Sequence, residues 1–530
     1  MGNINLLDCT LRDGGYVNDW EFGLDNLVNI FERLVSANVD IIEVGFLDER
    51  RSFDINRSIC PSTRDMDLIY DRLDKGSSMI VGMIDYGTCD IEKISPCKES
   101  FLDGIRVIFK KDKKEKAFEF CRQIKELGYK VFAQLVSITS YSDKELLEAI
   151  ELANEVKPYA VSIVDTYGLL HKNNLMHYCE VLDHNLLPEI GLGYHSHNNF
   201  QLAYSNCIEF LNARLKRDVV VDATLHGMGK SAGNAPIELL AMYLNETWGK
   251  KYDINHIMEA IDVNIMNIYR KTPWGYNFKF YISASNDCHP NYVAYLRNKH
   301  TLSIKSINAI LRELKGDKKL LYDEELIEKL YLDYQAQKIN DKETINILKK
   351  KFEGENIVLL GPGKSIETEK GRIKEYIQQK KGLVISTNFL HDEYPISYVF
   401  LSNSKRYVQL SATLNRYETK VIATSNVTKT NGEFDFVLQY SSLLDLDATI
   451  IDNSLLMLLK VMMKIGVKKV ALAGFDGYST TDNHNYFKSN MEYKFEPLKA
   501  KEINEYVLEK IKRFREQLEI EFITTSYYQN

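Results

Sequence analysis

The stretch LLDCTLRDGG, residues 6–15, is an apolar run that ends abruptly in an arginine, an aspartate and two glycines. Alone, such an ending is typical of a surface turn, because charged side chains are readily hydrated and glycine fits turn conformations. It indicates a functional site only if other strands also end in polar clusters. The rest of the chain decides between these two interpretations.

Seven more β-rich runs follow in the first part of the chain, and amphipathic helical patterns separate them. The eight runs span 4–9, 40–46, 78–85, 104–109, 130–136, 159–165, 190–195 and 218–226. Nearly continuous apolar strands predict a parallel sheet that is buried on both faces and has helical crossovers. Eight strand–helix units in about 250 residues predict a (β/α)₈ TIM barrel. A doubly wound open sheet is the alternative, but the regular units and the lack of an early GxGxxG motif favour the barrel.

Two further parts follow the predicted barrel, which we assign to residues 1–250. Residues 251–350 have helical periodicity without strand runs and predict a helical domain. Residues 351–530 return to alternating strands and helices, which predicts a Rossmann-like open α/β domain. A long helix at 499–519 is expected to close the chain.

Composition excludes several classes of protein. The net charge of −7 gives no global attraction to nucleic acid or to an anionic membrane. No apolar run approaches the roughly 20 residues of a membrane span, and the N-terminus lacks the pattern of a signal peptide. The eight cysteines are scattered and form no CxxC pair. We therefore expect a cytoplasmic protein with reduced thiols, no membrane span and no nucleic-acid partner.

Polar clusters stand where the strands of the predicted barrel end, which is where barrel enzymes place their chemistry. His195 and His197 are two residues apart, so an extended strand directs both imidazoles to one side. With the carboxylate of Asp13 and the amide of Asn234, they predict a nitrogen and oxygen site for a divalent cation. Arg12 is placed to hold a substrate carboxylate or to stabilise an enolate oxygen.

Other strand ends supply further candidate residues. Glu43 is a candidate catalytic group, and the candidate substrate-binding residues are Asp165, Asn198 and His226. Each motif alone has an ordinary structural interpretation, because paired histidines often only form hydrogen bonds and a glycine loop can bind any phosphate. The three motifs together at the mouths of strands 1, 7 and 8 favour a metal site.

The runs TLRDG, HSHNN and GMGKSAGNAP resemble those of the DRE-TIM metallolyases, a superfamily of pyruvate aldolases and acyl-condensing enzymes. The resemblance covers about residues 3–250. It implies a divalent ion, Mn²⁺ or Mg²⁺ with Zn²⁺ as a further option, held by Asp13, His195 and His197. Asn234 sits where some members add a fourth ligand, and Arg12 matches the arginine that stabilises the enolate.

The branch of the superfamily is indicated by the loop HGMGKSAGN. It has no cysteine, which disfavours a reaction like that of hydroxymethylglutaryl-CoA lyase, and it is most similar to 4-hydroxy-2-oxoacid aldolases. Those enzymes place a histidine base three residues after the metal-binding aspartate, where this chain has Tyr16. A tyrosine could serve in acid–base catalysis only with a lowered pKa or through a metal-bound water, and Tyr16 could equally be a packing or binding residue.

The resemblance implies a pyruvate-like 2-oxoacid as one substrate and an aldehyde or acyl group as its partner. One alternative is Claisen condensation of an acyl-CoA with a 2-oxoacid, as in isopropylmalate synthases. Another is a nucleotide-sugar transferase whose barrel is catalytically idle. We also expect a homo-oligomer.

In the third part, LLGPGKSIE (359–367) is a glycine turn between a strand and a helix. It is not a Walker A motif, and a tight βα turn is an equal interpretation. With STNF (386–389) and AGFDGY (473–478), it resembles the domain shared by bacterial sialyltransferase-like glycosyltransferases and pterin diphosphokinase-like proteins. This implies a nucleotide or nucleotide-sugar and a role in surface-polysaccharide biosynthesis. The residues expected near the nucleotide are Gly361, Gly363, Lys364, Ser365, Asn388, Asp476 and His484.

Overall fold

The structure is a computed structural model that describes residues 2–299, 302–319, 322–336, 339–414, 419–427, 434–448, 450–481, 484–492 and 495–529. The chain divides into two compact units, Met1–Pro290 and Asn291–Asn530, which are described separately below. The three-part division into 1–250, 251–350 and 351–530 stays a prediction.

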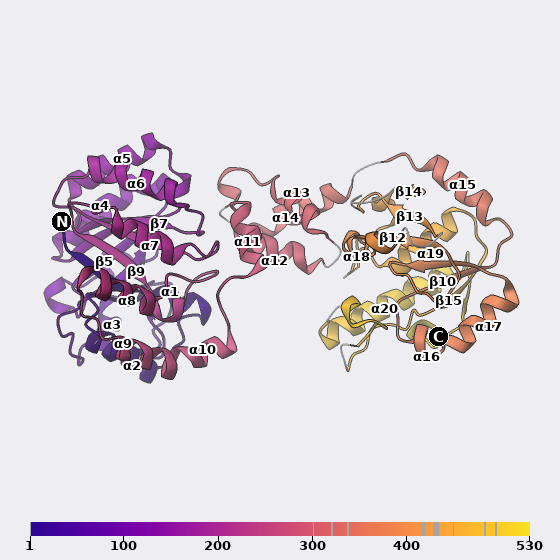
Figure 1. The fold of residues 1–530 in the computed structure, drawn as a ribbon, viewed down its shortest axis with the longest axis horizontal. Coiled ribbons are helices and arrows are strands. Elements are labelled where there is room, and N and C mark those ends of the chain that lie inside the picture. The colour runs from indigo at the N-terminus through magenta and orange to yellow at the C-terminus, as the bar shows by residue number, and fades with distance from the viewer. Residues whose placement is uncertain are drawn as a thin grey trace. The chain divides into compact units, whose positions relative to one another are not determined.

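The first unit contains a closed barrel of eight parallel strands, which confirms the predicted TIM barrel (Figure 1). Its strands are β1 (Ile4–Asp8), β2 (Ile41–Leu47), β4 (Met79–Asp85), β5 (Gly104–Phe109), β6 (Lys130–Leu135), β7 (Ala160–Asp165), β8 (Gly191–Ser196) and β9 (Val219–Ala223). The barrel closes because β1 pairs with both β9 and β2. A short strand, β3 (Ile59–Cys60), pairs with β2 at its edge.

The last barrel strand is shorter than predicted. The run 218–226 was expected to be extended, but β9 ends at Ala223. His226 has a φ of 52°, which lies in the left-handed region and cannot continue a strand. The chain therefore turns away from the strand direction at the barrel mouth, so His226 is not part of an extended strand.

Amphipathic helices separate the strands and cover the barrel. They are α2 (Leu24–Ser36), α3 (Thr63–Tyr70), α4 (Lys114–Glu126), α5 (Asp143–Val156), α6 (Lys172–Asn185), α7 (Ala203–Asn212) and α8 (Ile237–Trp248). After the barrel come α9 (Ile254–Ala260), a π-helical turn (Ile261–Ile265), α10 (Met266–Lys271) and α11 (Phe278–Ser285). One buried apolar core joins the strands and helices from Ile4 to Ile265.

The polar end of β1 is fixed by close packing. A short helix, α1 (Thr10–Asp13), follows the strand and leads to Gly14 and Gly15. A Cβ atom on Gly15 would lie 2.0 Å from the ring of Trp20, so only glycine fits beneath this indole. The indole nitrogen of Trp20 donates a hydrogen bond to the carbonyl of Arg12 at 2.8 Å. The glycine therefore provides space for a side chain that pins the backbone of Arg12.

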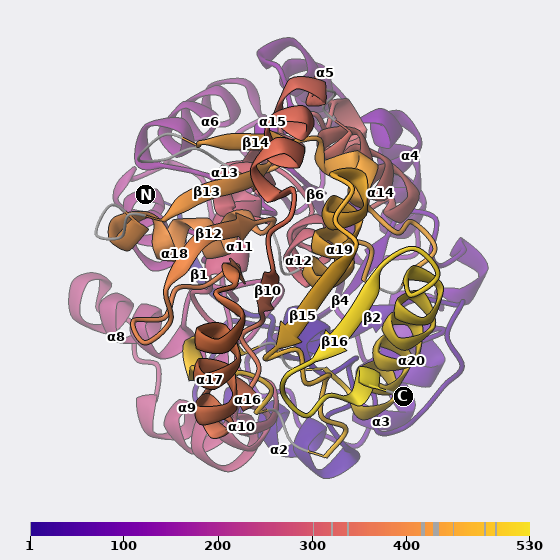
Figure 2. The same ribbon diagram turned by 90° about the vertical axis from the view of Figure 1, so that its right-hand side faces the viewer.

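The second unit begins with helices α12 (Pro290–Asn298), α13 (Ile304–Leu311), α14 (Glu324–Gln335) and α15 (Lys342–Phe352). An open sheet follows, and all of its paired strands are parallel (Figure 2). Its strands are β10 (Ile357–Leu360), β11 (Leu383–Thr387), β12 (Ile396–Leu401), β13 (Lys420–Thr424), β14 (Phe436–Leu438), β15 (Lys469–Ala473) and β16 (Glu519–Phe522). The order β14-β13-β12-β11-β10-β15-β16 confirms the predicted open α/β architecture.

Helices cover both faces of this sheet. One apolar core contains side chains of α15, α19 (Ser454–Lys464) and α20 (Pro497–Phe514), and two others contain side chains of α17 (Lys370–Lys380) and α18 (Ser404–Leu414). The expected closing helix was wrong at its end, because α20 stops at Phe514 and β16 follows it. The sequence of β16, EIEF, alternates glutamate with apolar residues, which is a strand pattern and not a continuation of the helix.

Among the described residues, no helix is long and apolar enough to span a membrane.

Candidate metal centre in the barrel

Three metal-binding side chains meet at the carboxyl-terminal mouth of the barrel. Nε2 of His197 lies 3.5 Å from Oδ2 of Asp13, and Nε2 of His195 lies 4.0 Å from Oδ1 of Asp13. Ligand atoms of all three residues lie within 4.8 Å of one another, and the three side chains are buried. The end of β8 supplies both histidines, whereas Asp13 comes from the helical turn after β1. The two sequence motifs therefore form one cluster.

Asn234 joins this cluster through the glycine loop. It forms an isolated antiparallel bridge with His197, and its Nδ2 donates to Oδ2 of Asp13 at 2.7 Å and to the carbonyl of Met228 at 3.2 Å. Its Oδ1 and Nε2 of His197 are buried and have no hydrogen-bond partner in the described part of the chain. Buried polar atoms are normally paired, so these two atoms fit a site for a cation.

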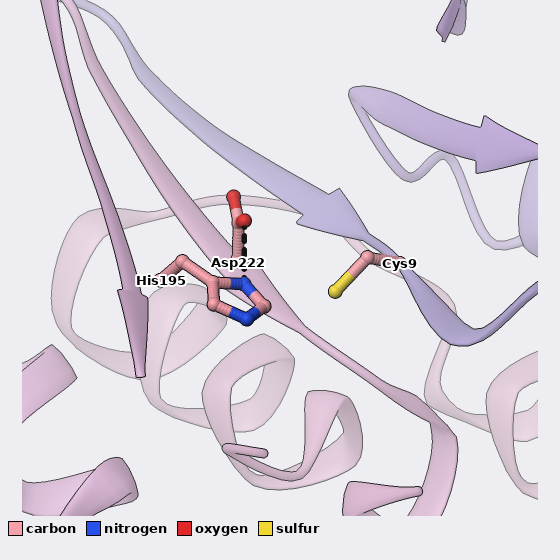
Figure 3. A group of neighbouring side chains, drawn as sticks. All are labelled: Cys9, His195 and Asp222. Carbon is pink, nitrogen blue, oxygen red and sulfur yellow. Dashed lines mark hydrogen bonds and ion pairs between the residues drawn. The ribbon is translucent and has the colours of Figure 1, made fainter. Parts of the chain in front are cut away.

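A second cluster, drawn in Figure 3, contains Cys9, His195 and Asp222. Nδ1 of His195 shares a hydrogen bond of 2.9 Å with Oδ2 of Asp222. The thiol of Cys9 donates to the carbonyl of Ala223, and burial raises its pKa well above the ordinary value. Asp222 thus orients the imidazole and leaves Nε2 toward Asp13, which is the usual arrangement behind a metal-binding histidine.

The imidazole of His197 is oriented in the same way. Its Nδ1 lies 3.0 Å from the backbone carbonyl oxygen of Asp165, which can accept a hydrogen bond from that nitrogen. Both histidines therefore direct Nε2 toward the carboxylate of Asp13.

Charged side chains continue from the cluster into the barrel. Arg12 donates from Nη1 to Asp13 at 2.6 Å and from Nε to Glu43 at 2.7 Å. Arg106 forms ion pairs with Glu43, at 3.1 Å, and with Asp222. All five side chains are buried. When all five are ionised, three carboxylates face two guanidinium groups, and the excess negative charge favours a bound cation.

The pKa shifts place these groups in the forms that a metal requires. Burial lowers the pKa of His195 to about 4, so its imidazole is neutral at pH 7. Burial alone would raise the pKa of Asp13, but Arg12 and His197 hold that pKa well below its ordinary value. Neutral imidazole and ionised carboxylate are the forms in which both residues bind metals.

One nitrogen of the Arg12 guanidinium is left for a ligand in the described part of the chain. Its side chain is 6% exposed, and Nε and Nη1 are bonded as described above. Nη2 forms no hydrogen bond with any residue that the structure describes. Glu43 lies behind this guanidinium, and its Oε2 contacts both arginines. Glu43 thus holds Arg12 through Oε2, whereas its buried Oε1 has no partner among the described residues, and its catalytic role stays a prediction.

Tyr16 lies at the same mouth, and its ring packs edge-on against Trp20 at a centroid distance of 4.8 Å. Desolvation raises the pKa of its phenol to about 12, although the residue is 42% exposed. A raised pKa keeps the phenol protonated at pH 7, so Tyr16 suits a hydrogen-bond donor better than a base.

Two of the three candidate substrate-binding side chains accept hydrogen bonds from nearby backbone amides, and the third packs against an aromatic ring. Both carboxylate oxygens of Asp165 accept amides of the next loop, from Leu169 and Leu170. Oδ1 of Asn198 accepts the amide of Ala203 at the start of α7. The ring of His226 lies edge-on to Trp274, at 6.1 Å between centroids. They shape the loops of the mouth, and their contact with a substrate stays a prediction.

Three residues of the barrel unit, Asp222, Arg106 and Lys230, were not predicted from the sequence. Arg106 and Asp222 are charged residues within otherwise apolar strands, GIRVIF and VVVDA, and this is the signal that could have identified them. Nζ of Lys230 lies 5.5 Å from the ring centroid of Tyr16, and burial lowers the pKa of its ammonium. No sequence pattern separates Lys230 from an ordinary loop lysine.

The candidate nucleotide-binding residues all lie in the second unit. Gly363, Asn388 and Asp476 line one cavity. Gly361, Lys364 and Ser365 belong to the adjoining turn and are not among the described lining residues, and neither is His484.

The fold is a TIM barrel, and the described residues at its mouth form a mixed nitrogen and oxygen cluster that could hold a metal ion. Residues 3–263 match the model of the HMGL-like family. The oxaloacetate decarboxylase of Mycobacterium tuberculosis is 24% identical over 295 residues, which cover 52% of this chain and 82% of that protein. The matches to relatives therefore lie in about half of the chain.

Two further relatives have different reactions in their names. The 2-isopropylmalate synthase of Sulfurisphaera tokodaii is 25% identical over 260 residues, covering 48% of this chain and 64% of that protein. The 4-hydroxy-2-oxovalerate aldolase 2 of Salinispora arenicola is 25% identical over 244 residues, covering 46% of this chain and 68% of that protein. All three relatives are similar to this chain over about half of its length, and their names give three different reactions.

Proposed function

We propose that the barrel is a divalent-metal-dependent enzyme that forms or cleaves a carbon–carbon bond at the carbon next to the keto group, through the enolate of a pyruvate-like 2-oxoacid. The observation that carries this proposal is the pair of orphaned buried atoms, Nε2 of His197 and Oδ1 of Asn234, beside the carboxylate of Asp13. A divalent ion at this position, Mn²⁺ or Mg²⁺, would supply Lewis-acid polarisation of a carbonyl group.

The side chains around this position have separate tasks. Asp13, His195, His197 and Asn234 would hold the ion. Nη2 of Arg12 would donate to the oxygen on which negative charge develops as the enolate forms, and a fixed donor there lowers the barrier without reorganisation. Asp13 and Glu43 hold the guanidinium in place. The protonated phenol of Tyr16 would donate to a substrate oxygen at the mouth.

Within this class we favour aldol chemistry on a 4-hydroxy-2-oxoacid. The glycine loop HGMGKSAGN has no cysteine that could act as an acid, and a named aldolase is among the relatives. Claisen condensation of an acyl-CoA with a 2-oxoacid is the alternative, because an isopropylmalate synthase is also a relative. Both reactions require an enolate, but the enolate comes from pyruvate in the first case and from the acyl-CoA in the second.

Proton exchange tests this function. We would incubate the metal-free protein with pyruvate in D₂O, with Mn²⁺ in one sample and with EDTA in another, and quench the samples for NMR after removing the metal. We expect metal-dependent loss of the methyl proton signal, and loss of that exchange in Arg12→Ala and Asp13→Ala. Lys144→Ala is the matched control, because that side chain is 87% exposed on the barrel surface.

Exchange in acetyl-CoA but not in pyruvate would select the condensing reaction. No exchange in either compound, with metal bound at the Asp13 cluster, would contradict the proposed enolate chemistry. It would favour the alternative in which the barrel is catalytically idle.

We also propose that the second unit binds a nucleotide or a nucleotide-sugar. The observation that favours this is a cavity at the carboxyl edge of its parallel sheet, where open α/β sheets bind ligands. A transferase fused to an aldolase would suit the assembly of an unusual sugar for a surface polysaccharide. A rise in the melting temperature of the second unit with nucleotides tests this proposal.

A further inference from the structure

The cavity of the second unit has a volume of about 310 Å³ and lies at the ends of four neighbouring strands. Its lining includes Gly363 after β10, Asn388 after β11, Asn403 after β12 and Gly474 after β15. The volume falls within the range of pockets for small ligands.

The strand order explains why a crevice opens there. From β10 the chain passes outward through β11, β12, β13 and β14, and it then returns to place β15 on the other side of β10. The connections after β10 and β15 therefore depart in opposite directions. A ligand site outside the carboxyl ends of such strands is the general rule for open parallel sheets.

The glycine turn beside this cavity does not present open amides. The N–H of Gly361 donates to the carbonyl of Ala473, and that of Gly363 donates to the carbonyl of Gly474, both at 2.8 Å. Oδ2 of Asp476 accepts the amide of Ser365 at 2.8 Å, and Oδ1 accepts its hydroxyl. The carboxylate of Asp476 would repel a phosphate at this turn. The backbone amides of Gly361, Gly363 and Ser365 already donate hydrogen bonds within the protein. The anionic part of a ligand must lie elsewhere.

A buried hydroxyl in the lining lacks a partner. Thr387, the last residue of β11, is 2% exposed, and its Oγ1 has no hydrogen bond to any described residue. The neighbouring Asn388 is engaged, because Nδ2 donates to Ser402 and Ser454 and Oδ1 accepts the amide of Ser402. A polar group of a ligand would satisfy Thr387, and leaving such a hydroxyl unpaired is costly.

Aromatic side chains form another part of the wall. Phe475 and Tyr478 follow β15, and Tyr486 and Phe495 come from the segments before α20. The rings of Tyr478 and Phe495 pack edge to face, with their centroids 5.0 Å apart. Partly exposed aromatic rings of this kind provide surfaces on which a flat ring can stack.

The charges in the lining are balanced, but one cation is unpaired. Lys299 is bonded to Glu328 at 2.8 Å, and Arg406 donates to the carbonyl of Met491. Lys499, near the start of α20, is exposed and forms no ion pair within the described ranges. An anionic group of a ligand could therefore approach the ammonium of Lys499 without displacing an ion-pair partner among the described residues.

We propose that the cavity binds a nucleotide whose base stacks on the aromatic wall, whose sugar hydroxyl pairs with Thr387, and whose phosphate lies by Lys499 and away from the glycine turn. This inference rests on the proposed nucleotide binding of the second unit and assigns its orientation. A sugar phosphate shares the hydroxyl and phosphate chemistry but cannot use the aromatic wall in the same way.

Binding would be measured by titration calorimetry on the full chain with AMP, GMP, CMP, UMP, the matching nucleosides, ribose 5-phosphate and inorganic phosphate. We expect at least one nucleotide to bind more tightly than its nucleoside, and ribose 5-phosphate to bind weakly. Thr387→Val, which keeps the shape of the side chain, should weaken nucleotide and nucleoside alike by about 3- to 10-fold.

Lysine variants separate the two positions for the phosphate. Lys499→Ala should weaken the nucleotide by about 5-fold and leave the nucleoside unchanged, as expected for one charged contact. Lys501→Ala is the matched control on the same helix, because it pairs with Glu505 and is outside the described lining. Lys364→Ala should have no effect if the glycine turn does not receive the phosphate.

The outcomes distinguish the two proposals. Nucleotide binding that is lost in Lys364→Ala and retained in Lys499→Ala would overturn the orientation and leave nucleotide binding standing. Ribose 5-phosphate binding as tightly as the nucleotides would assign the cavity to a sugar phosphate. No binding of any nucleotide would overturn both proposals for the second unit, without bearing on the barrel.

Discussion

Asp222 and Arg106 show how a few side chains inside the barrel prepare its mouth. Neither residue is at the candidate metal position, but Asp222 sets the orientation of His195 and Arg106 links Asp222 to Glu43 and so to Arg12. Removing one member of a buried charge network leaves its partners uncompensated, and the cost exceeds that of an exposed pair. The geometry of Asp13, His195 and Arg12 thus depends on residues that contact no substrate.

Asp222→Asn tests this dependence. We expect the affinity for Mn²⁺ to fall by about 10- to 100-fold, because a partner behind a metal-binding histidine has effects of this size. Titration calorimetry with Mn²⁺ on metal-free protein would measure it, and Asp90→Asn, at an exposed position, is the control. Unchanged affinity in a folded Asp222→Asn protein would contradict the orienting role.

At the scale of elements, the glycine loop after β9 determines how closely the backbone approaches the cluster. A Cβ atom on Gly229 would lie 2.2 Å from Nδ2 of Asn234 and 2.6 Å from Oδ2 of Asp13. Both atoms are the ends of buried side chains in the candidate metal cluster, so a Cβ atom here would force one of them to shift. The loop therefore contributes through the absence of a side chain as well as through Asn234.

Gly229→Ala should displace Asp13 or Asn234 and abolish measurable Mn²⁺ binding, with a loss of roughly 1–3 kcal/mol in the free energy of unfolding from overpacking. Denaturant unfolding and metal titration would measure the two effects. Gly371→Ala is the control, because a Cβ there meets no atom within 4 Å. Normal metal affinity in Gly229→Ala would show that the loop can shift without disturbing the site.

At the scale of the whole molecule, the two units have separate apolar cores. A core from Ile4 to Ile265 lies in the first unit, and the cores of the second unit include one from Leu348 to Tyr528. A ligand stabilises the part of a protein that binds it, in proportion to the logarithm of its concentration over Kd. We therefore expect a metal ion to stabilise the barrel unit against unfolding and a nucleotide to stabilise the second unit. The expected homo-oligomer and the cytoplasmic location stay predictions.

Differential scanning calorimetry of the full chain tests this separation. Mn²⁺ at 100 times its Kd should stabilise the barrel unit by about 2.7 kcal/mol and raise only the transition of that unit. Addition of EDTA should reverse the shift. Asp13→Ala is the control, since it should show no shift with Mn²⁺. A metal-dependent shift of the second unit alone would place the ion outside the barrel.

The sequence by itself determined the barrel, the second parallel sheet and the motifs that form the candidate metal cluster. Strand periodicity depends on burial and is local, and HxH on a strand fixes two imidazoles on one side without any distant contact. Tertiary structure alone decided which of the remaining polar residues are available. Asp165 and Asn388 are bonded within the fold, and Glu43 is bonded through Oε2 but has a buried Oε1 without a partner among the described residues. Asp222 contacts His195 of the neighbouring strand, and Thr387 has a hydroxyl unpaired among the described residues. Hydrogen-bond partners far apart in sequence leave no periodic signal, and this is why the sequence located the site but not the residues that support it.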